Sequence, residues 1–234
     1  HPQSKSSRRY LPNNMIIIFD LDDTLYEEMT FVKGGMRAVS KFLKDHLKES
    51  PQLIYEELMN ILSIQGRNKI FDTLLKNKNK FKKYLVLECI NKYRYHKPNI
   101  KLHKSAIDFL KSNKYQNLYL VTDGNKKVQF EKVKALNIIK IFKKIFITHR
   151  YGIKNAKPSL YCFKKIKQLE NCAWEDLVYI GDNPEKDFVS LKKVKAKTIR
   201  VLTGNYSDFI ASEINDANYT INSLSELGSL LKKL

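Results

Sequence analysis

Short apolar segments alternate with helical segments along the second half of the chain, and this alternation restricts the fold more than any other feature. The apolar segments are residues 117–121, 144–148, 177–180 and 198–201, and apolar residues at helical spacing lie between them. Strands that alternate with helices form βαβ units, and such units build a parallel sheet. A further apolar segment, 15–19, has to join the same sheet, because a lone parallel strand has no partner. We therefore predict an α/β fold with a three-layer α/β/α core around a parallel sheet.

The segment between the first strand and the others has a different pattern. Apolar residues recur there at helical spacing, and no run alternates as a strand would. Pro51 suits the first turn of a helix, and about four helices are expected in all. The paired glycines Gly34 and Gly35 tolerate large backbone changes, so we expect either a hinge or a helix-start turn there. The predicted organisation is an N-terminal tail at 1–14, an α/β core domain at 15–32 and 97–234, and an inserted all-helical domain at 33–96.

The composition is that of a basic globular protein. The chain has 234 residues, 43% of them hydrophobic, and a net charge of +19. This length can bury one substantial core and a small second module. A basic excess attracts anions such as phosphorylated metabolites or nucleic acid. Lysine is nevertheless scattered over most of the helical segments, and the densest basic stretch, 76–83, contains Asn and no Arg. We therefore expect a small phosphorylated partner and no specific nucleic acid.

The cysteines and the apolar segments bear on the compartment. Cys89, Cys162 and Cys172 form no CxxC pair and no ligand cluster with histidines. Scattered thiols in odd number suit a reducing compartment better than a disulfide framework. No apolar run approaches the roughly 20 residues that span a bilayer, and no signal-peptide pattern is visible. We expect a cytoplasmic protein without a membrane partner, and the sequence leaves the oligomeric state open.

Polar residues follow four of the predicted strands. They are Asp20, Asp22 and Asp23 after the first strand, Thr122, Asp123 and Gly124 after the second, Lys157 after the third, and Asp182 and Asp187 after the fourth. The carboxyl ends of parallel strands meet at one edge of the sheet, so these side chains should converge. Carboxylates packed closely repel one another unless a cation lies between them. Oxygen ligands without thiols favour Mg²⁺ as that cation.

This set of groups suits phosphoryl transfer. A carboxylate can attack phosphorus and form a phospho-aspartate, which divides one difficult step into two easier ones. A second acid two residues away can protonate the leaving oxygen and later activate water. A magnesium ion neutralises phosphoryl charge, while a lysine and a hydroxyl hold the remaining oxygens.

Four short motifs resemble those of the haloacid dehalogenase superfamily. Residues 20–24 (Asp-Leu-Asp-Asp-Thr) resemble its DxDxT motif, 122–123 its second motif, 157–158 its third, and 181–187 its GDxxxD motif. They occur in the family's order, and the resemblance covers about residues 15–205. It implies a Rossmann-like core, and a helical insertion directly after the first motif is similar to the family's class I cap.

The resemblance implies roles for four carboxylates. Asp20 is the expected nucleophile and a magnesium ligand. Asp22 is the expected general acid and base, and its backbone carbonyl is expected to ligate the metal. Asp182 is a further expected ligand, and Asp187 acts from the same motif, through water or directly.

The resemblance also implies a phosphate-binding set. Thr122 is expected to bind the phosphoryl group, with help from the backbone N–H groups at Asp123 and Gly124. Lys157 is expected to steady both the nucleophile and the phosphoryl charge. Asp123 departs from the family pattern, because many members carry a neutral residue at this position.

Taken together, these features predict a Mg²⁺-dependent phosphomonoester hydrolase with a sugar phosphate, a nucleotide or a phosphorylated acid as substrate. The second acid, Asp22, argues against the dehalogenases and the phosphonate-cleaving members of the family. A phosphomutase shares all four motifs and stays open. A basic nucleic-acid-binding module with an inactive site is a less favoured alternative, and so is one domain of a larger enzyme.

Overall fold

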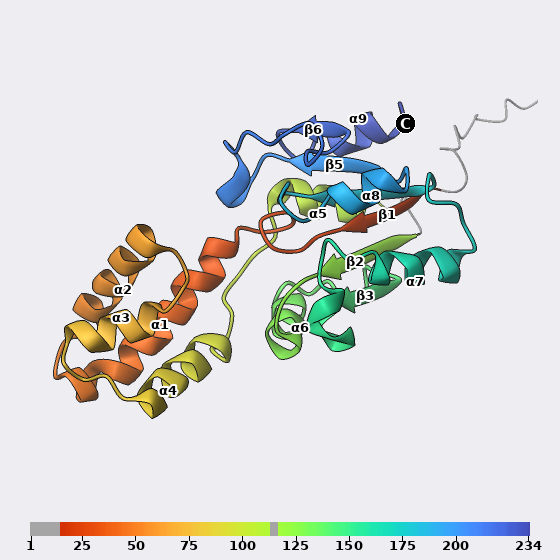
Figure 1. Ribbon diagram of the computed structural model, residues 1–234. Coiled ribbons are helices and arrows are strands. Elements are labelled where there is room, and N and C mark those ends of the chain that lie inside the picture. Colours follow the sequence, from red (N-terminus) through yellow and green to blue (C-terminus); the bar gives the residue numbers. More distant parts are fainter. Residues whose placement is uncertain (1–14, 113–116) are drawn as a thin grey trace, which may run out of the picture. The chain divides into compact units, whose positions relative to one another are not determined.

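The computed structural model describes residues 15–112 and 117–234, and the predicted tail at 1–14 lies outside them (Figure 1). Within this part of the chain, six parallel strands form one sheet in the order β3-β2-β1-β4-β5-β6. The strands are β1 (Ile16–Phe19), β2 (Leu118–Thr122), β3 (Lys144–Ile147), β4 (Leu177–Gly181), β5 (Lys197–Val201) and β6 (Tyr219–Ile221). The predicted α/β class with a parallel sheet is therefore confirmed.

Helices cover both faces of the sheet, as the uninterrupted burial of β1 requires. Side chains alternate between the faces of a strand. Ile16 and Ile18 share one buried cluster with residues of α7 (Tyr161–Glu170) and α8 (Val189–Lys193). On the opposite face, the ring of Phe19 lies 5.6 Å from that of Phe109, which belongs to α5 (Lys104–Lys111). This is the three-layer arrangement that the alternating pattern predicts.

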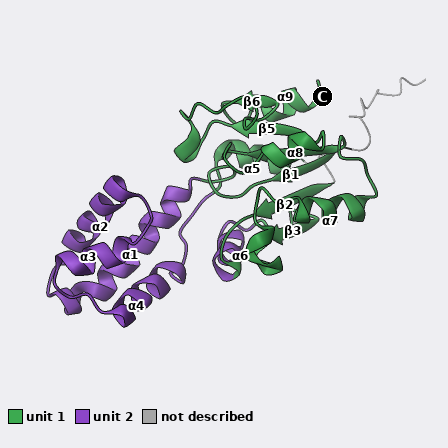
Figure 2. Ribbon diagram, viewed as in Figure 1, with its two compact units in different colours: residues 1–26, 102–126, 138–234 green, residues 27–101, 127–137 purple. Residues whose placement is uncertain are grey.

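The chain divides into two compact units (Figure 2). The α/β unit comprises the described residues of 1–26, 102–126 and 138–234, and the helical unit comprises 27–101 and 127–137. Besides most of α6 (Lys126–Ala135), the helical unit contains four helices. They are α1 (Glu28–Leu47), α2 (Pro51–Gln65), α3 (Ile70–Asn77) and α4 (Lys83–Arg94). The hydroxyl of Ser50 accepts a hydrogen bond from the Leu53 N–H (3.3 Å), which caps α2.

The adjacent glycines of the helical unit do not lie in the helix-start turn that the sequence suggested. Gly34 and Gly35 lie inside α1, so the prediction of a helix-start turn is wrong, and that of a hinge stays a prediction. A Cβ at Gly35 would overlap the ring of Tyr93, and one at Gly34 would lie 2.8 Å from the imidazole of His96. The glycines therefore let the end of α4 and the residues after it pack closely against α1.

Two elements near the C-terminal end are absent from the sequence prediction. β6 (Tyr219–Ile221) adds the sixth strand, and α9 (Leu227–Leu231) follows it. Both are too short for a periodic pattern to appear in the sequence. Among the described residues, no helix combines the length and the apolar character needed to cross a membrane.

Candidate active site

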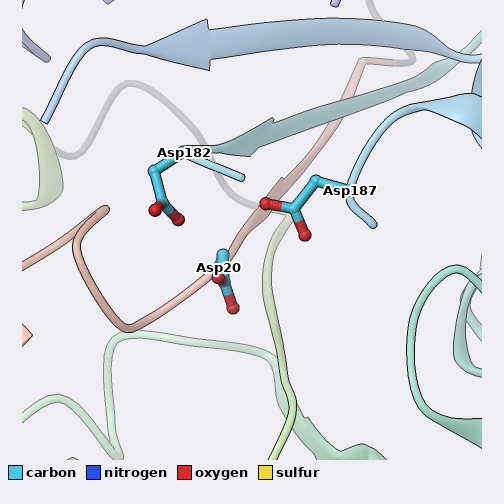
Figure 3. Close-up of side chains that lie close together, drawn as sticks. All are labelled: Asp20, Asp182 and Asp187. Atoms are coloured by element: carbon cyan, nitrogen blue, oxygen red, sulfur yellow. The ribbon is translucent and has the colours of Figure 1, made fainter. Parts of the chain in front are cut away.

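Three carboxylates meet at the carboxyl end of the central strands. Asp20 follows β1 and Asp182 follows β4, and these two strands are hydrogen-bonded neighbours. The Asp20 N–H donates to the carbonyl of Ile180 (2.8 Å), which continues the strand pairing up to the site. With Asp187, one carboxylate oxygen from each residue lies within 4.8 Å of the others (Figure 3). The structure thus brings together three of the four acids predicted to hold the metal.

This carboxylate group fits a hard cation. All three residues are buried. Burial raises the pKa of Asp20 to about 7, and Lys157 only partly opposes the shift. Burial, followed by the charges of Asp187 and Asp20, raises the pKa of Asp182 to about 9. Acids held so near each other in a water-poor site favour a bound cation, and their oxygen donors suit Mg²⁺.

Lys157 is buried beside these acids. Its ammonium nitrogen lies 2.9 Å from Oδ1 of Asp20 and 2.8 Å from Oδ1 of Asp187. It also donates to the hydroxyl of Tyr179 (2.8 Å). Burial by itself would lower the pKa of Lys157, but the charges of Asp187 and Asp20 raise it well above its usual value. The lysine therefore stays cationic next to the predicted nucleophile.

Tyr179 is a contributor that the sequence analysis missed. Its hydroxyl donates to Oδ1 of Asp187 (3.2 Å) while it accepts from Lys157. Burial raises the pKa of Tyr179 well above its usual value, so the hydroxyl remains protonated. Tyr179 lies in the apolar run of β4 and reads there as a core residue. The only available signal was general, since the hydroxyl of a fully buried tyrosine needs a partner.

Asp187 closes the turn after β4. Its Oδ2 accepts the Asn183 N–H (3.0 Å), and its Oδ1 faces Lys157 and Tyr179. A Cβ at Gly181 would overlap the Asp187 carboxylate, so the strand must end in glycine for this side chain to fit. Both oxygens of Asp187 therefore have protein partners, which suits holding Lys157 at least as well as binding a metal.

Asp22 stands apart from the carboxylate group. It is half-buried, and its Oδ1 accepts the hydroxyl of Tyr26 at 2.5 Å. The hydroxyl of Thr24 points instead to Oδ1 of Asp182 (3.4 Å). The turn after β1 thus directs Asp20 and Thr24 toward Asp182, and its Asp22 side chain toward Tyr26.

The residues at the end of β2 include one partner of Lys157. Thr122 is buried at the end of the strand, and Gly124 has a φ of 128°, which side-chain-bearing residues rarely adopt. Oδ1 of Asp123 accepts from the Thr148 hydroxyl (2.7 Å) and from the Lys157 N–H (3.1 Å). The Asp123 side chain therefore holds the main chain of Lys157, a contact that the sequence did not indicate.

The loop after β5 braces the first turn from the other side. Asp23 has a φ of 54°, its carbonyl accepts the hydroxyl of Thr203, and its Oδ2 accepts the Asn205 N–H (3.4 Å). A Cβ at Gly204 would overlap the Asp23 side chain. Asp23 is therefore a structural residue of this turn, and its partners lie too far along the chain to be read from local sequence.

Comparison with known proteins identifies the family. A sequence profile described as "Haloacid dehalogenase-like hydrolase" matches residues 17–201, which is more than half of the chain. The chain belongs to the haloacid dehalogenase-like hydrolases, as the four motifs predicted.

Relatives and solved structures agree with this assignment. The chain is 34% identical over 233 residues to the glyceraldehyde 3-phosphate phosphatase of Methanocaldococcus jannaschii, covering 93% of this chain and 97% of the relative. It is 26% identical to the enzyme of the same name from Pyrococcus furiosus, covering 93% of each chain. Its fold resembles the magnesium-bound haloacid dehalogenase-type hydrolase YfnB from Bacillus subtilis, with a TM-score of 0.68, 19% identity, and coverage of 93% of this chain and 98% of that one.

Proposed function

We propose that this protein is a Mg²⁺-dependent phosphomonoester hydrolase that acts through a phospho-aspartate at Asp20. The observation that carries the proposal is the buried contact of Lys157 with Asp20, at 2.9 Å, beside the carboxylate group. A fixed cation next to a buried carboxylate offsets part of the rise in pKa that burial causes, and it directs one of the carboxylate oxygens. The named phosphatases among the relatives point to the same reaction.

In the first step, an Asp20 oxygen forms a bond to phosphorus and the bond from phosphorus to the leaving oxygen breaks. Asp22 gives its proton to that leaving oxygen. In the second step, Asp22 takes a proton from water, the water oxygen bonds to phosphorus, and the Asp20 oxygen leaves with its electron pair. The Tyr26 hydroxyl at 2.5 Å from Asp22 Oδ1 orients the acid for both transfers.

The phosphoryl oxygens are held by groups at the ends of β2 and after β3. We assign this role to the hydroxyl of Thr122, the backbone N–H groups of Asp123 and Gly124, and the ammonium of Lys157. Asp20 and Asp182, with the carbonyl of Asp22, would hold Mg²⁺, and Asp187 would support them. When bound, Mg²⁺ neutralises negative charge on the phosphoryl group.

The substrate we propose is a small phosphorylated sugar, with glyceraldehyde 3-phosphate as the first candidate. This choice rests on the names of relatives that match almost the whole chain, one of them at 34% identity. It selects the sugar phosphate from the three substrate classes that the motifs allow.

We further propose that the inserted helices act as a cap that selects the substrate and excludes water. The compact helical unit, whose larger part is 27–101, is the natural candidate, and it begins before the predicted boundary at residue 33. The three free thiols favour a reducing compartment such as the cytoplasm as the place of action.

The test is phosphate release from glyceraldehyde 3-phosphate and a panel of other phosphomonoesters, with and without Mg²⁺. Asp20→Asn is the control, because it keeps the shape of the side chain and removes the nucleophile. Release that needs both the metal and Asp20 supports the proposal. A folded protein that releases no phosphate from any ester contradicts it, and phosphate retained on a rearranged product would indicate a mutase instead.

A further inference from the structure

Tyr179 lies in a part of β4 that no motif of the sequence marks. It is fully buried, with 0% of its surface exposed, in the cluster that packs one face of the sheet. Its ring packs in the core, where the ring centroids of Tyr179 and Phe163 lie 5.1 Å apart and the two ring planes are nearly perpendicular. Its hydroxyl, however, reaches the charged network at the strand end. The two ends of this side chain therefore have different surroundings.

The hydroxyl completes the set of acceptors around Lys157. An ammonium group has three N–H donors and no acceptor. Its three acceptors here are Oδ1 of Asp20, Oδ1 of Asp187 and the Tyr179 hydroxyl, at 2.9, 2.8 and 2.8 Å. Two of these contacts come from β4 and the turn after it, so they fix the direction of the third donor toward Asp20.

The orientation of the hydroxyl is itself determined. Its proton is donated to Asp187 (3.2 Å), which leaves its oxygen lone pairs for Lys157. The tyrosine is held by a rigid, buried strand, whereas the lysine side chain has four rotatable bonds. Without the hydroxyl, the ammonium would keep only two carboxylates and would be free to rotate between them.

We propose that Tyr179 is a positioning residue, whose hydroxyl aims the Lys157 ammonium at the nucleophile and at the phosphoryl group that the nucleophile attacks. This rests on the proposed phosphatase function. The hydrogen bonds of the Tyr179 hydroxyl go to Lys157 and Asp187, so it acts on the nucleophile through Lys157. A phenylalanine at this position would keep the ring packing and lose the hydrogen bond that directs the Lys157 ammonium toward Asp20.

The chain contains a matched control for the substitution. Tyr119 lies in β2, is 1% exposed and belongs to the same buried cluster. Its hydroxyl also donates a hydrogen bond to an acid, Glu170. Glu170 is the last residue of α7, and it also pairs with Lys143. Tyr119→Phe therefore removes a hydroxyl from the same layer without touching Lys157, although its bond is part-buried where those of Tyr179 are buried.

The experiment compares the wild type, Tyr179→Phe and Tyr119→Phe with saturating Mg²⁺ and the best ester of the panel. We expect Tyr179→Phe to lower kcat about tenfold, with KM changed less than about twofold. The position of the Lys157 ammonium should affect the transition state more than substrate binding. Tyr119→Phe should keep kcat within about twofold and lower the melting temperature less, because its hydroxyl bond is only part-buried. Equal kcat values for the two variants would overturn the proposal and leave Tyr179 as a packing residue.

Crystal structures of the wild type and Tyr179→Phe separate this proposal from the proposed function. We expect the Lys157 nitrogen of the variant to lie outside hydrogen-bond distance of Asp20, or to occupy two positions. A nitrogen that stays within hydrogen-bond distance of Asp20 in a single position overturns the positioning role, whatever the activity. A wild type that releases no phosphate would sink the phosphatase proposal alone, and the position of Lys157 would still decide the role of Tyr179.

Discussion

Two lysine ion pairs, one in each compact unit, differ in their burial. In the α/β unit, Lys157 and Asp20 form an ion pair with side chains only 1% and 5% exposed. In the helical unit, Lys78 joins Glu49 at 2.9 Å, but these side chains are 22% and 28% exposed. Water solvates the second pair and screens its attraction, whereas the first pair depends on its protein partners. The difference shows that burial, and not the short distance between the charges, decides how much each pair depends on its partner.

The two pairs should also differ in how much unfolding free energy is lost when the lysine is replaced. Removing one partner of a buried pair leaves an uncompensated charge, and the protein must accept a proton or rearrange. Removing one partner of an exposed pair leaves a charge that water solvates. The same substitution should therefore have unequal effects in the two units.

The largest expected effect is that of Lys157→Met. At pH 8 we expect a loss of about 3 kcal/mol of unfolding free energy, because Asp20 and Asp187 lose their buried counter-charge. We also expect kcat to fall roughly a thousandfold, since the nucleophile and the phosphoryl group lose their fixed cation. Chemical denaturation and phosphate release measure the two effects.

Lys78→Met in the helical unit is the matched control. It should cost less than about 1 kcal/mol and leave kcat unchanged, because its partners Glu49 and Glu57 remain hydrated. Equal losses of stability for the two lysine variants would show that burial does not distinguish the pairs, and the comparison would fail.

A second prediction concerns pH and metal. The pKa of Asp20 is raised to about 7 and that of Asp182 to about 9, so both acids bind protons more tightly in the folded state than in the unfolded state. Their contribution to stability is complete below about pH 4 and is lost as pH rises through 7 and 9. Bound Mg²⁺ replaces those protons, so its stabilising effect should grow over the same range.

We expect saturating Mg²⁺ to raise the melting temperature by roughly 5–10 °C at pH 9 relative to a chelator, and by much less at pH 5. Thermal scans at pH 5, 7 and 9 with Mg²⁺ or EDTA make the measurement. The same scans of an Asp182→Asn variant provide the control, because one of the two titrating ligands is removed. A metal effect that is constant across pH would contradict the assignment of these acids to the metal.

The sequence predicted the parts of the fold that local pattern determines. The predicted strand boundaries differ from those of β1 to β5 by at most one residue, since buried parallel strands are continuous apolar runs. The three-residue strand β6 escaped, because it offers too few residues for a pattern. The glycine pair misled, because a glycine that admits a neighbouring ring looks in sequence like a glycine that bends.

The candidate site divides in the same manner. The meeting of Asp20, Asp182 and Asp187 followed from topology, since each comes after a strand of one parallel sheet. The other partners of Lys157 did not follow from topology. Tyr179 lies inside the apolar run of β4, and the carboxylate of Asp123 binds the main chain of Lys157. Which residue follows a strand can be read from sequence, whereas which atom a side chain touches depends on tertiary packing.

Asp123 provides the smallest expected effect and sharpens the comparison, because it can separate charge from hydrogen-bond geometry within the α/β unit. Its Oδ1 accepts from Thr148 and from the Lys157 N–H, while Lys186, whose side chain is 37% exposed, lies 3.7 Å from Oδ2. The charge of Asp123 also helps to raise the pKa of Lys157. An asparagine keeps an oxygen that can accept both bonds and loses the exposed attraction to Lys186 and a minor attraction to Lys157, whose larger charge partners are Asp187 and Asp20. Asp123→Asn should therefore keep kcat/KM within about threefold, whereas Asp123→Ala should lower it roughly tenfold by releasing the main chain of Lys157. Steady-state kinetics of both variants make the measurement. A large loss of kcat/KM in Asp123→Asn would mean that the negative charge itself matters beside Lys157. Asp123 would then belong with the buried charges, such as Asp20, and not with the exposed ones.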